Sequence, residues 1–404
     1  MEMEKEKVSK KFFIEDNMCT PYKLILSRAN RFLIENGWKN ANSPEEADLH
    51  IVGGCAAFHS LENEALELIK SAKKAKKAEI IAFGCLPTIS PEKVKPLNPD
   101  RIIHARSWER LETLVKNPKV LLNEVPDAHE FRSDEEYRVN DPGRAFILVE
   151  TGCSSNCPFC PHKIGIGKLK SRPMPEVIKQ AKYLMESNKK IHTIVLHGND
   201  TGSYGTDIGT TFPELVKQVV KIVPRLHLTQ VNADWAYKYR EELFPLLKKE
   251  EKIKEFQVLV QSSSPRILNL MERAPEVKEL YPYLKNLRKA RPDLILRTDL
   301  MIGYPTSTME EDKESLDFVS KLFDEVAIHG FEQFTHARIM KMGLPFHSQK
   351  EIDKRITYAI GFMKSFPAIL AHHGGQVYST MEGIEGPKVQ MRKDRDNLLE
   401  VVNR

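Results

Sequence analysis

The sequence is poor in cysteine and in aromatic residues, and it lacks any long apolar run. No stretch approaches the roughly 18 consecutive apolar residues that a membrane-spanning helix needs. The amino terminus reads MEMEKEKVSKK, without the apolar core or the cleavage site of a signal peptide. We therefore expect a cytoplasmic protein with no membrane partner. The net charge of +5 over 404 residues is small, so charge alone identifies no partner.

Three of the six cysteines, Cys153, Cys157 and Cys160, form a C-x3-C-x2-C run in the segment ETGCSSNCPFC. In a reducing compartment, clustered cysteines indicate metal binding or catalysis rather than disulfides. Zinc is the alternative, but zinc sites usually add a second close pair of Cys or His, and only His162 is near. Three thiolates on a four-iron cluster leave one iron open for substrate chemistry. The run therefore favours an iron–sulfur cluster with a reactive iron.

The other three cysteines, Cys19, Cys55 and Cys85, are 36 and 30 residues apart. Taken singly, each would more often be a small buried core residue. However, Cys55 and Cys85 directly follow predicted strands at 48–53 and 79–84, and Cys19 soon follows the short predicted strand KFFIE. The carboxyl ends of parallel strands share one edge of a sheet, where ligands bind. This placement predicts a second, auxiliary cluster.

The alternation of strands and helices predicts an α/β protein with two domains. Residues 1–118 read as an open parallel α/β sheet domain, and the polar stretch 119–143 reads as a linker. Residues 144–366 read as a partial (β/α)6 barrel with its chemistry on the carboxyl-end loops, and 367–404 as a short β-rich extension. The barrel strands are predicted at 144–151, 192–198, 226–231, 255–262, 294–302 and 326–331. Helices are predicted at 21–37, 60–77, 107–116, 176–187, 212–223, 276–290, 309–322 and 352–366.

Four further segments stand in order after the cysteine run. They are Ser171-Arg172-Pro173, LHGNDTGSYG (196–205), VQSSSPRILNLMERA (260–274) and RTDLMIGYPTST (297–308). Together with ETGCSSNCPFC and the spacing of the amino-terminal cysteines, they resemble the radical S-adenosylmethionine (SAM) methylthiotransferases. This family acts on tRNA adenosines and on a ribosomal protein, and the resemblance covers residues 11–365.

The resemblance implies two 4Fe-4S clusters and SAM as cofactors. Cys153, Cys157 and Cys160 would hold the cluster that chelates SAM and releases a 5′-deoxyadenosyl radical from it. The auxiliary cluster on the other three cysteines would carry the sulfur that is methylated and then inserted at the activated carbon. A one-electron reductant such as flavodoxin or ferredoxin would serve as partner.

The resemblance also implies a set of residues on the SAM side of the barrel. They are Phe159, Gly198, Asn199, Asp200, Gln261, Ser262 and Arg273. The carboxylate of Asp200 suits the ammonium group of SAM. Phe159 would lie at the adenine, although ordinary loop packing is its alternative, and Arg273 could instead cap a helix.

The chain departs from the family pattern in three places. Gly53-Gly54 stands where the family usually has Asn-Thr, and Asn232-Ala233 stands where it commonly has His or Glu before Pro. We expect these two positions to affect substrate contacts more than the cofactor. After the last predicted helix only 38 residues remain, too few for the closed RNA-binding β-barrel of the RNA-modifying members.

We therefore expect a methylthiotransferase-like radical SAM enzyme that inserts sulfur or a methylthio group at an unactivated C–H bond. The expected substrate is a peptide, such as a ribosomally made precursor, or a small molecule. The alternative is a tRNA adenosine methylthiotransferase with a reduced RNA anchor that uses the basic run 70–77, which otherwise reads as a solvated helix face. A non-catalytic iron–sulfur electron carrier is the other class, but it would need no SAM pocket.

Overall fold

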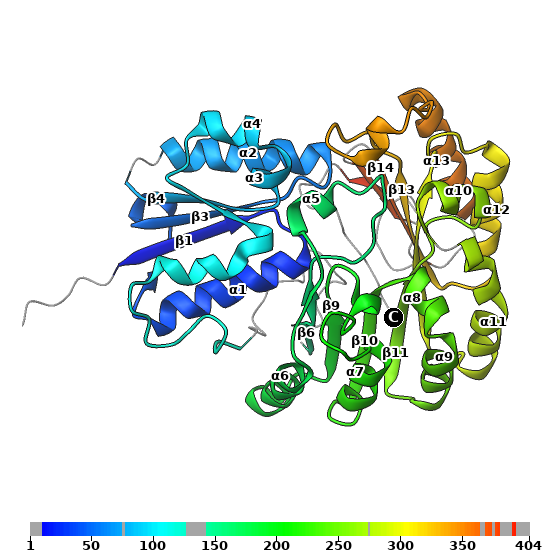
Figure 1. Cartoon of the computed structure of the whole chain (residues 1–404), viewed down its shortest axis with the longest axis horizontal. Coiled ribbons are helices and arrows are strands. Elements are labelled where there is room, and N and C mark those ends of the chain that lie inside the picture. Colours follow the sequence, from blue (N-terminus) through cyan, green and yellow to red (C-terminus); the bar gives the residue numbers. More distant parts are fainter. Residues whose placement is uncertain are drawn as a thin grey trace, which may run out of the picture. The chain divides into compact units, whose positions relative to one another are not determined.

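The computed structural model describes residues 10–74, 77–126, 143–273, 275–363, 368–373, 376–379 and 390–392. The chain divides into two compact units, each built on its own sheet (Figure 1). The first comprises Met1–Phe131 with Ile164–Gly167, and the second comprises Arg132–Lys163 with Lys168–Arg404. Among the described residues, no helix has the length and apolar character needed to span a membrane.

The first unit is a five-stranded parallel sheet with strand order β2-β1-β3-β4-β5. Its strands are β1 (Lys11–Asp16), β2 (Lys39–Asn40), β3 (Leu49–Gly54), β4 (Glu79–Gly84) and β5 (Arg101–His104). Figure 1 shows α1 (Thr20–Glu35) on one face and α2 (His59–Lys74), α3 (Leu86–Ile89) and α4 (Pro91–Val94) on the other. Every residue of the central strand β3 is buried, as expected for a strand covered on both faces. The predicted open α/β sheet is confirmed, although the helix predicted at 107–116 is a 3-10 segment, Ala105–Leu114.

The second unit is built on a nine-stranded sheet with order β16-β15-β14-β13-β12-β11-β10-β9-β6. The strands are β6 (Arg144–Leu148), β9 (Thr193–His197), β10 (Arg225–Asn232), β11 (Ile253–Leu259), β12 (Ile295–Ile302), β13 (Glu325–Gly330), β14 (Ala368–His373), β15 (Gln376–Ser379) and β16 (Gln390–Arg392). The six predicted barrel strands are present and parallel. A seventh parallel strand, β14, follows them, and β15 and β16 pair antiparallel beyond it. The remainder of the carboxyl-terminal extension lies outside the described residues.

Helices cover the outer face of this sheet (Figure 1). They are α6 (Met174–Ser187), α7 (Phe212–Val219), α8 (Ala233–Lys238), α9 (Arg240–Lys249), α10 (Pro265–Leu270), α11 (Leu280–Ala290), α12 (Met309–Ser320) and α13 (Gln349–Met363). Two of them begin at a capping box: Thr211 with Glu214 at α7, and Thr308 with Glu311 at α12. A continuous apolar core fills the space between the sheet and these helices. The predicted partial barrel is therefore confirmed as the fold of the second unit.

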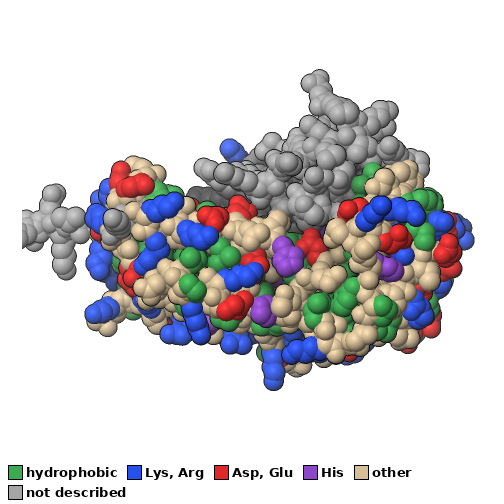
Figure 2. Space-filling model, turned by 90° about the horizontal axis from the view of Figure 1, so that it is seen from above, with side chains coloured by type: hydrophobic (Ala, Val, Ile, Leu, Met, Phe, Trp, Pro, Cys, Tyr) green, Lys and Arg blue, Asp and Glu red, His purple; other side chains and the backbone are tan. Residues whose placement is uncertain are grey.

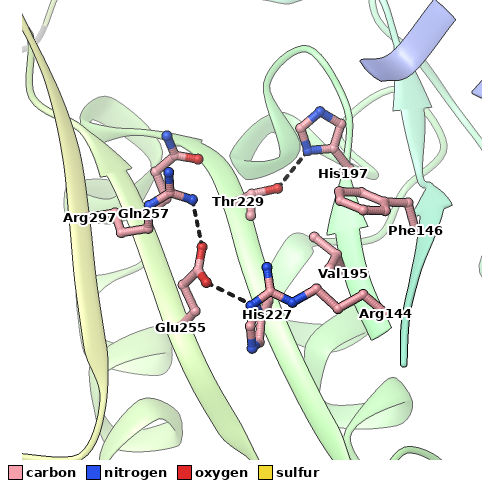
Figure 3. A pocket seen from close by; sticks show the side chains of 9 residues that line it. All are labelled: Arg144, Phe146, Val195, His197, His227, Thr229, Glu255, Gln257 and Arg297. Atoms are coloured by element: carbon pink, nitrogen blue, oxygen red, sulfur yellow. Dashed lines mark hydrogen bonds and ion pairs between the residues drawn. The ribbon is translucent and has the colours of Figure 1, made fainter. Parts of the chain in front are cut away.

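The inner face of the sheet carries charged residues rather than the branched apolar layers of closed barrels. Figure 3 shows a small cavity on this face. It is lined by His227, Glu255 and Arg297 together with Arg144, Phe146, Val195, His197, Thr229 and Gln257. Arg297 lies at the centre of the network, with Nη1 at 2.9 Å from Glu255 Oε1 and Nε at 2.8 Å from Glu325 Oε2. The second oxygen of Glu255 lies 2.9 Å from His227 Nδ1. Burial lowers the pKa of His197 to about 3, with the charge of Arg297 acting in the same direction, so that imidazole is neutral.

Replacing Arg297 with methionine should destabilise the protein strongly. The change leaves the carboxylates of Glu255 and Glu325 buried without their shared cation, which costs about 3–5 kcal/mol. The control Lys254→Met removes a surface ion pair with Asp293 and should cost at most about 1 kcal/mol. Urea unfolding measures both free energies. Equal, small losses in the two variants would show that the buried network does not hold the barrel.

Candidate active site

The cysteine run lies on a loop that leaves the sheet after a break in the predicted strand 144–151. Beyond β6, the two-residue strand β7 (Glu150–Thr151) pairs antiparallel with β8 (Lys170–Ser171). Gly152 then turns with φ of +76°, and a Cβ there would lie 1.9 Å from the carbonyl oxygen of Lys168. Only glycine allows this turn, which starts the segment 152–161 that we call the cluster loop.

The three thiols of the cluster loop lie close enough together to influence one another. All three are partly buried. Burial raises the pKa of Cys153 to about 12, with Asp200 and the other two thiols acting in the same direction. Burial also raises the pKa values of Cys157 and Cys160. Three partly buried thiols that repel one another as thiolates fit a group that brings positive charge, such as an iron–sulfur cluster.

Arg273 supplies positive charge beside these thiols. Its guanidinium donates to the Cys157 thiol and opposes the rise in the pKa of Cys157. Its Nε and Nη1 atoms are buried and have no hydrogen-bond partner within the described structure. The side chain therefore lies at the cluster loop and not over a helix end. Its two unpaired N–H groups fit a site that binds an anionic ligand.

Asp200 connects the loop after β9 to the cluster loop. Its Oδ2 lies 3.8 Å from Cys153 Sγ and accepts a hydrogen bond from Ser155 Oγ at 3.4 Å. Burial raises the pKa of Asp200 to about 6, while the nearby Arg273 charge opposes that rise. A buried carboxylate beside the cluster loop is chemically suited to an ammonium group.

Two residues that the sequence did not identify hold Asp200 in place. The indole N–H of Trp235 donates to Asp200 Oδ2 at 3.1 Å. The backbone N–H of Asn232 approaches Asp200 Oδ1 at 3.4 Å, and its side-chain amide donates to Ser155 Oγ at 3.1 Å. Both residues lie in the segment LTQVNADW, whose departure from the family pattern was the one available signal. These contacts place Asn232 beside the predicted cofactor-side residues, and the expected effect on substrate contacts stays a prediction.

The other predicted SAM-side residues have different surroundings. Asn199 Oδ1 accepts the backbone N–H of Gly152 at 3.0 Å, so this side chain fixes the cluster loop. Phe159 packs edge-on against Tyr304 with ring centroids 5.9 Å apart, which is the loop-packing contact. The Ser262 hydroxyl lies 3.3 Å from the Ser315 hydroxyl and accepts the N–H of Ser264, so it is used within the fold. Its role toward SAM stays a prediction.

Strained backbone marks the carboxyl ends of two central barrel strands. Gln261 follows β11 with φ of +65°, and Gln230 interrupts the β10 ladder with φ of +59°. A positive φ costs free energy in any residue other than glycine, and residues with such backbone angles cluster at functional sites. Gln261 was predicted from the resemblance, whereas Gln230 was not, because local pattern carries no signal for a bulge.

The auxiliary cysteines lie at the carboxyl ends of three adjacent strands. Cys19 follows β1 at the N-cap position of α1, Cys55 follows β3, and Cys85 follows β4 at the N-cap position of α3. The strand order β1-β3-β4 thus brings all three to one edge of the sheet, as the sequence predicted. The buried hydroxyl of Thr20 has no hydrogen-bond partner in the described part of the chain.

Glycines give these cysteine-bearing segments room to approach one another. A Cβ at Gly53 would lie 2.7 Å from both Asp16 Cβ and Leu26 Cδ1, beside the turn that leads to Cys19. A Cβ at Gly165, within the short segment that belongs to the first unit, would lie 2.9 Å from Cys85 Sγ. Close packing therefore favours glycine at position 53, and the expected effect on substrate contacts stays a prediction.

Among the described residues, no three His, Cys, Asp or Glu side chains are arranged around the position of a single metal ion. In a 4Fe-4S cluster each thiolate binds a different iron, so its ligands surround a larger group. The chemistry of the two cysteine sets fits such clusters. The assignment of individual cysteines as ligands stays a prediction.

Replacing Gly53 with alanine should disturb the edge that carries the auxiliary cysteines. The added Cβ overlaps Asp16 and Leu26, so we expect a stability loss of about 1–3 kcal/mol and a lower iron content after anaerobic reconstitution. The control is Gly361→Ala in α13, where a Cβ meets nothing within 4 Å and iron content should not change. Full iron content and unchanged stability in the Gly53 variant would contradict the packing argument.

Two families match different parts of the chain. The Radical SAM superfamily matches residues 147–319, and the uncharacterized protein family UPF0004 matches residues 19–104. The first range contains the cluster loop and the Asp200 loop. The second contains Cys19, Cys55 and Cys85. The two cysteine sets therefore lie in separately recognised parts of the sequence.

Solved structures support the fold. The radical SAM methyltransferase TsrM from Kitasatospora setae matches with a TM-score of 0.58 and 12% identity, over 82% of this chain and 77% of that chain. The cobalamin-dependent SAM radical enzyme OxsB matches with a TM-score of 0.54 and 14% identity, over 89% and 56%. At these identities the likeness concerns the fold alone.

Sequence relatives cover most of the chain. The ribosomal protein uS12 methylthiotransferase RimO of Clostridioides difficile is 29% identical over 79% of this chain and 74% of its own length. The threonylcarbamoyladenosine tRNA methylthiotransferase MtaB of Aquifex aeolicus is 26% identical over 80% of both chains. The tRNA-2-methylthio-N(6)-dimethylallyladenosine synthase of Thermotoga petrophila is 28% identical over 72% and 67%. The two family matches and these relatives together support the radical SAM methylthiotransferase family, whose enzymes use SAM and 4Fe-4S clusters.

Proposed function

We propose that the protein is a tRNA methylthiotransferase that modifies an adenosine derivative. The observation that carries this proposal is the presence of two cysteine sets in one chain, one on the cluster loop and one at the edge of the first sheet. An enzyme that only cleaved SAM would need the first set alone. The second set, at the ends of three adjacent strands, is suited to hold the sulfur donor.

The choice of substrate rests on the relatives. Those described above are named for tRNA adenosines or for a ribosomal protein. They give no support to the peptide or small-molecule substrate that the sequence first favoured. We therefore adopt the alternative, tRNA, as the substrate class, with ribosomal protein uS12 as the competing candidate.

The basic run 70–77, which begins on α2 and extends beyond its last residue Lys74, remains available for phosphate contact. Lys70 Nζ lies 2.6 Å from Glu67, and Lys73 and Lys77 lie 3.7 Å from Asp100 and Asp48. These pairs are at least partly exposed to solvent, where such interactions contribute little, so a phosphate can replace the carboxylate. Figure 2 shows Lys and Arg interspersed with Asp and Glu over the described part of one face, without a single basic stripe. A few phosphate contacts, and not a broad electrostatic surface, fit this distribution.

The residues of the chain have definable tasks in this reaction. When bound, the clusters and SAM supply a 5′-deoxyadenosyl radical that takes hydrogen from the substrate carbon, together with the sulfur that replaces it. Asp200 would bind the ammonium group of SAM. Trp235 and Asn232 hold the carboxylate of Asp200 in position. Arg273 offsets the negative charge of the thiolates. Phe159 and Tyr304 close the apolar side of the cluster loop against water.

The two cysteine sets should be separable by mutation. Anaerobically reconstituted protein should contain about eight irons, and Cys157→Ala and Cys55→Ala should each lose about half. Cys157→Ala should abolish formation of 5′-deoxyadenosine, whereas Cys55→Ala should keep some of it and lose sulfur transfer. Methylthio product from the Cys55 variant, or its full iron content, would refute the auxiliary assignment.

The substrate can be identified with reconstituted enzyme, SAM, sulfide and a low-potential reductant. We expect a methylthio-adenosine derivative in tRNA, detected by mass spectrometry of digested nucleosides, and no product in uS12 incubated in parallel. Changing Lys70, Lys73 and Lys77 together to Glu should weaken tRNA binding and reduce its salt dependence, since each lost phosphate contact removes nearly one unit of slope. Product formed only in uS12 would overturn the substrate proposal.

A further inference from the structure

Glu150 is a buried carboxyl group directly beneath the Asp200 loop. It lies on β7, three residues before Cys153, and its residue is 0% exposed. Its Oε1 accepts the backbone N–H of Asp200 at 2.8 Å. Its Oε2 is buried and has no hydrogen-bond partner among the described residues. A carboxylate in such a place would lack compensation for its lost hydration.

The surroundings of Glu150 favour its neutral form. Burial raises the pKa of Glu150 well above its usual range. The charges of Asp200 and Asp207 act in the same direction, and the N–H groups of Asp200 and Asn199 oppose them. Burial therefore favours the protonated form of the Glu150 carboxyl group. Its value to the site lies in the hydrogen bond that it accepts and in the space that it fills.

Gly198 is shaped to the same carboxyl group. A Cβ at position 198 would lie 2.0 Å from Glu150 Oε1 and 2.7 Å from its carboxyl carbon. The backbone at Gly198 thus packs directly against the carboxyl group of Glu150. Any side chain at position 198 would displace that group. This contact gives a physical reason for the glycine that the resemblance assigned to SAM binding.

Glu150 belongs to a closed set of contacts that joins the two loops of the site. Its Oε1 atom accepts the backbone N–H of Asp200. The neighbouring Asn199 accepts the N–H of Gly152, at the start of the cluster loop. Ser155, farther along that loop, donates to the Asp200 carboxylate. Displacing Glu150 would therefore loosen the Asp200 loop at the end that faces Cys153.

We propose that Glu150 is a positioning residue that fixes the Gly198–Asp200 loop against the cluster loop and so sets the direction of the Asp200 carboxylate. The inference rests on the proposed function, in which Asp200 binds the ammonium group of SAM. Glu150 acts on the site through this loop, because its Oε1 atom accepts the backbone N–H of Asp200. Its effect on SAM is transmitted through the orientation of Asp200.

The test compares Glu150→Gln with Glu150→Ala in reconstituted enzyme. Glutamine keeps the neutral shape and the acceptor oxygen, so the Kd for SAM should stay within about threefold of wild type. Alanine leaves the Asp200 N–H without its acceptor, and the Kd should rise about tenfold or more. The iron content of both variants should match wild type. Addition of SAM should change the electron paramagnetic resonance spectrum of the reduced enzyme. At one fixed SAM concentration, this change should be lost in the alanine variant and kept in the glutamine variant.

Leu184→Ala is the control for general loss of stability. Leu184 is fully buried in the core under α6, and its truncation destabilises the same unit without touching either loop. Its Kd for SAM should equal that of wild type. If Glu150→Ala does not fold, Asn199→Ala tests the same connection by removing the acceptor of the Gly152 N–H, and the Kd for SAM should again rise.

Three results would overturn the proposal. Wild-type affinity in Glu150→Ala would show that the loop needs no support from this side chain. Equal loss in Glu150→Gln and Glu150→Ala would show that a negative charge, and not a neutral acceptor, is required. Equal loss in Leu184→Ala would assign the effect to global stability. Failure of the methylthiotransferase proposal is recognised separately, because wild-type enzyme would then bind and cleave SAM without forming a methylthio product.

Discussion

The parallel pairing of strands is the constraint on which both candidate sites depend. Parallel strands all end at the same edge of the sheet. Residues that follow different strands therefore lie near one another even when they are far apart in the sequence. Cys55 and Cys85 follow neighbouring strands of the first sheet. Asp200, Asn232 and Gln261 stand at the ends of β9, β10 and β11, which are neighbours in the second. The order of the strands therefore determines which side chains meet at each site.

Burial of like charges is the second physical theme of the cluster-loop site. Three partly buried thiols lie in the same region as the buried carboxyl groups of Asp200 and Glu150. In that environment the cost of an ionised group is high unless a cation or several donors face it. For Glu150 this cost raises the pKa well above its usual range and so favours the protonated form. Asp200 meets it through donors and through Arg273, which leaves a carboxylate ready for a cationic ligand.

Periodicity in the sequence predicted the regular elements well, because burial of one face leaves a pattern over many residues. Predicted strands at 192–198 and 326–331 differ from β9 and β13 by one residue at each end. The break at Val149 was missed, since its N–H pairs with His197 while its carbonyl accepts from Arg172, a contact across the fold. Trp235 and Glu150 were missed for the same reason: their roles are set by distant partners and not by neighbours in sequence.

Asn232-Ala233, which stands where the family commonly has His or Glu before Pro, forms the start of helix α8 in this chain. A proline at the first helical position presets the backbone for a helix and needs no N–H donor there. In this chain α8 begins at Ala233, and the Asn232 side chain caps it by approaching the N–H of Asp234 at 3.4 Å. The same amide also reaches Ser155, so the substitution ties the start of α8 to the cluster loop, and Trp235 one turn later is presented to Asp200.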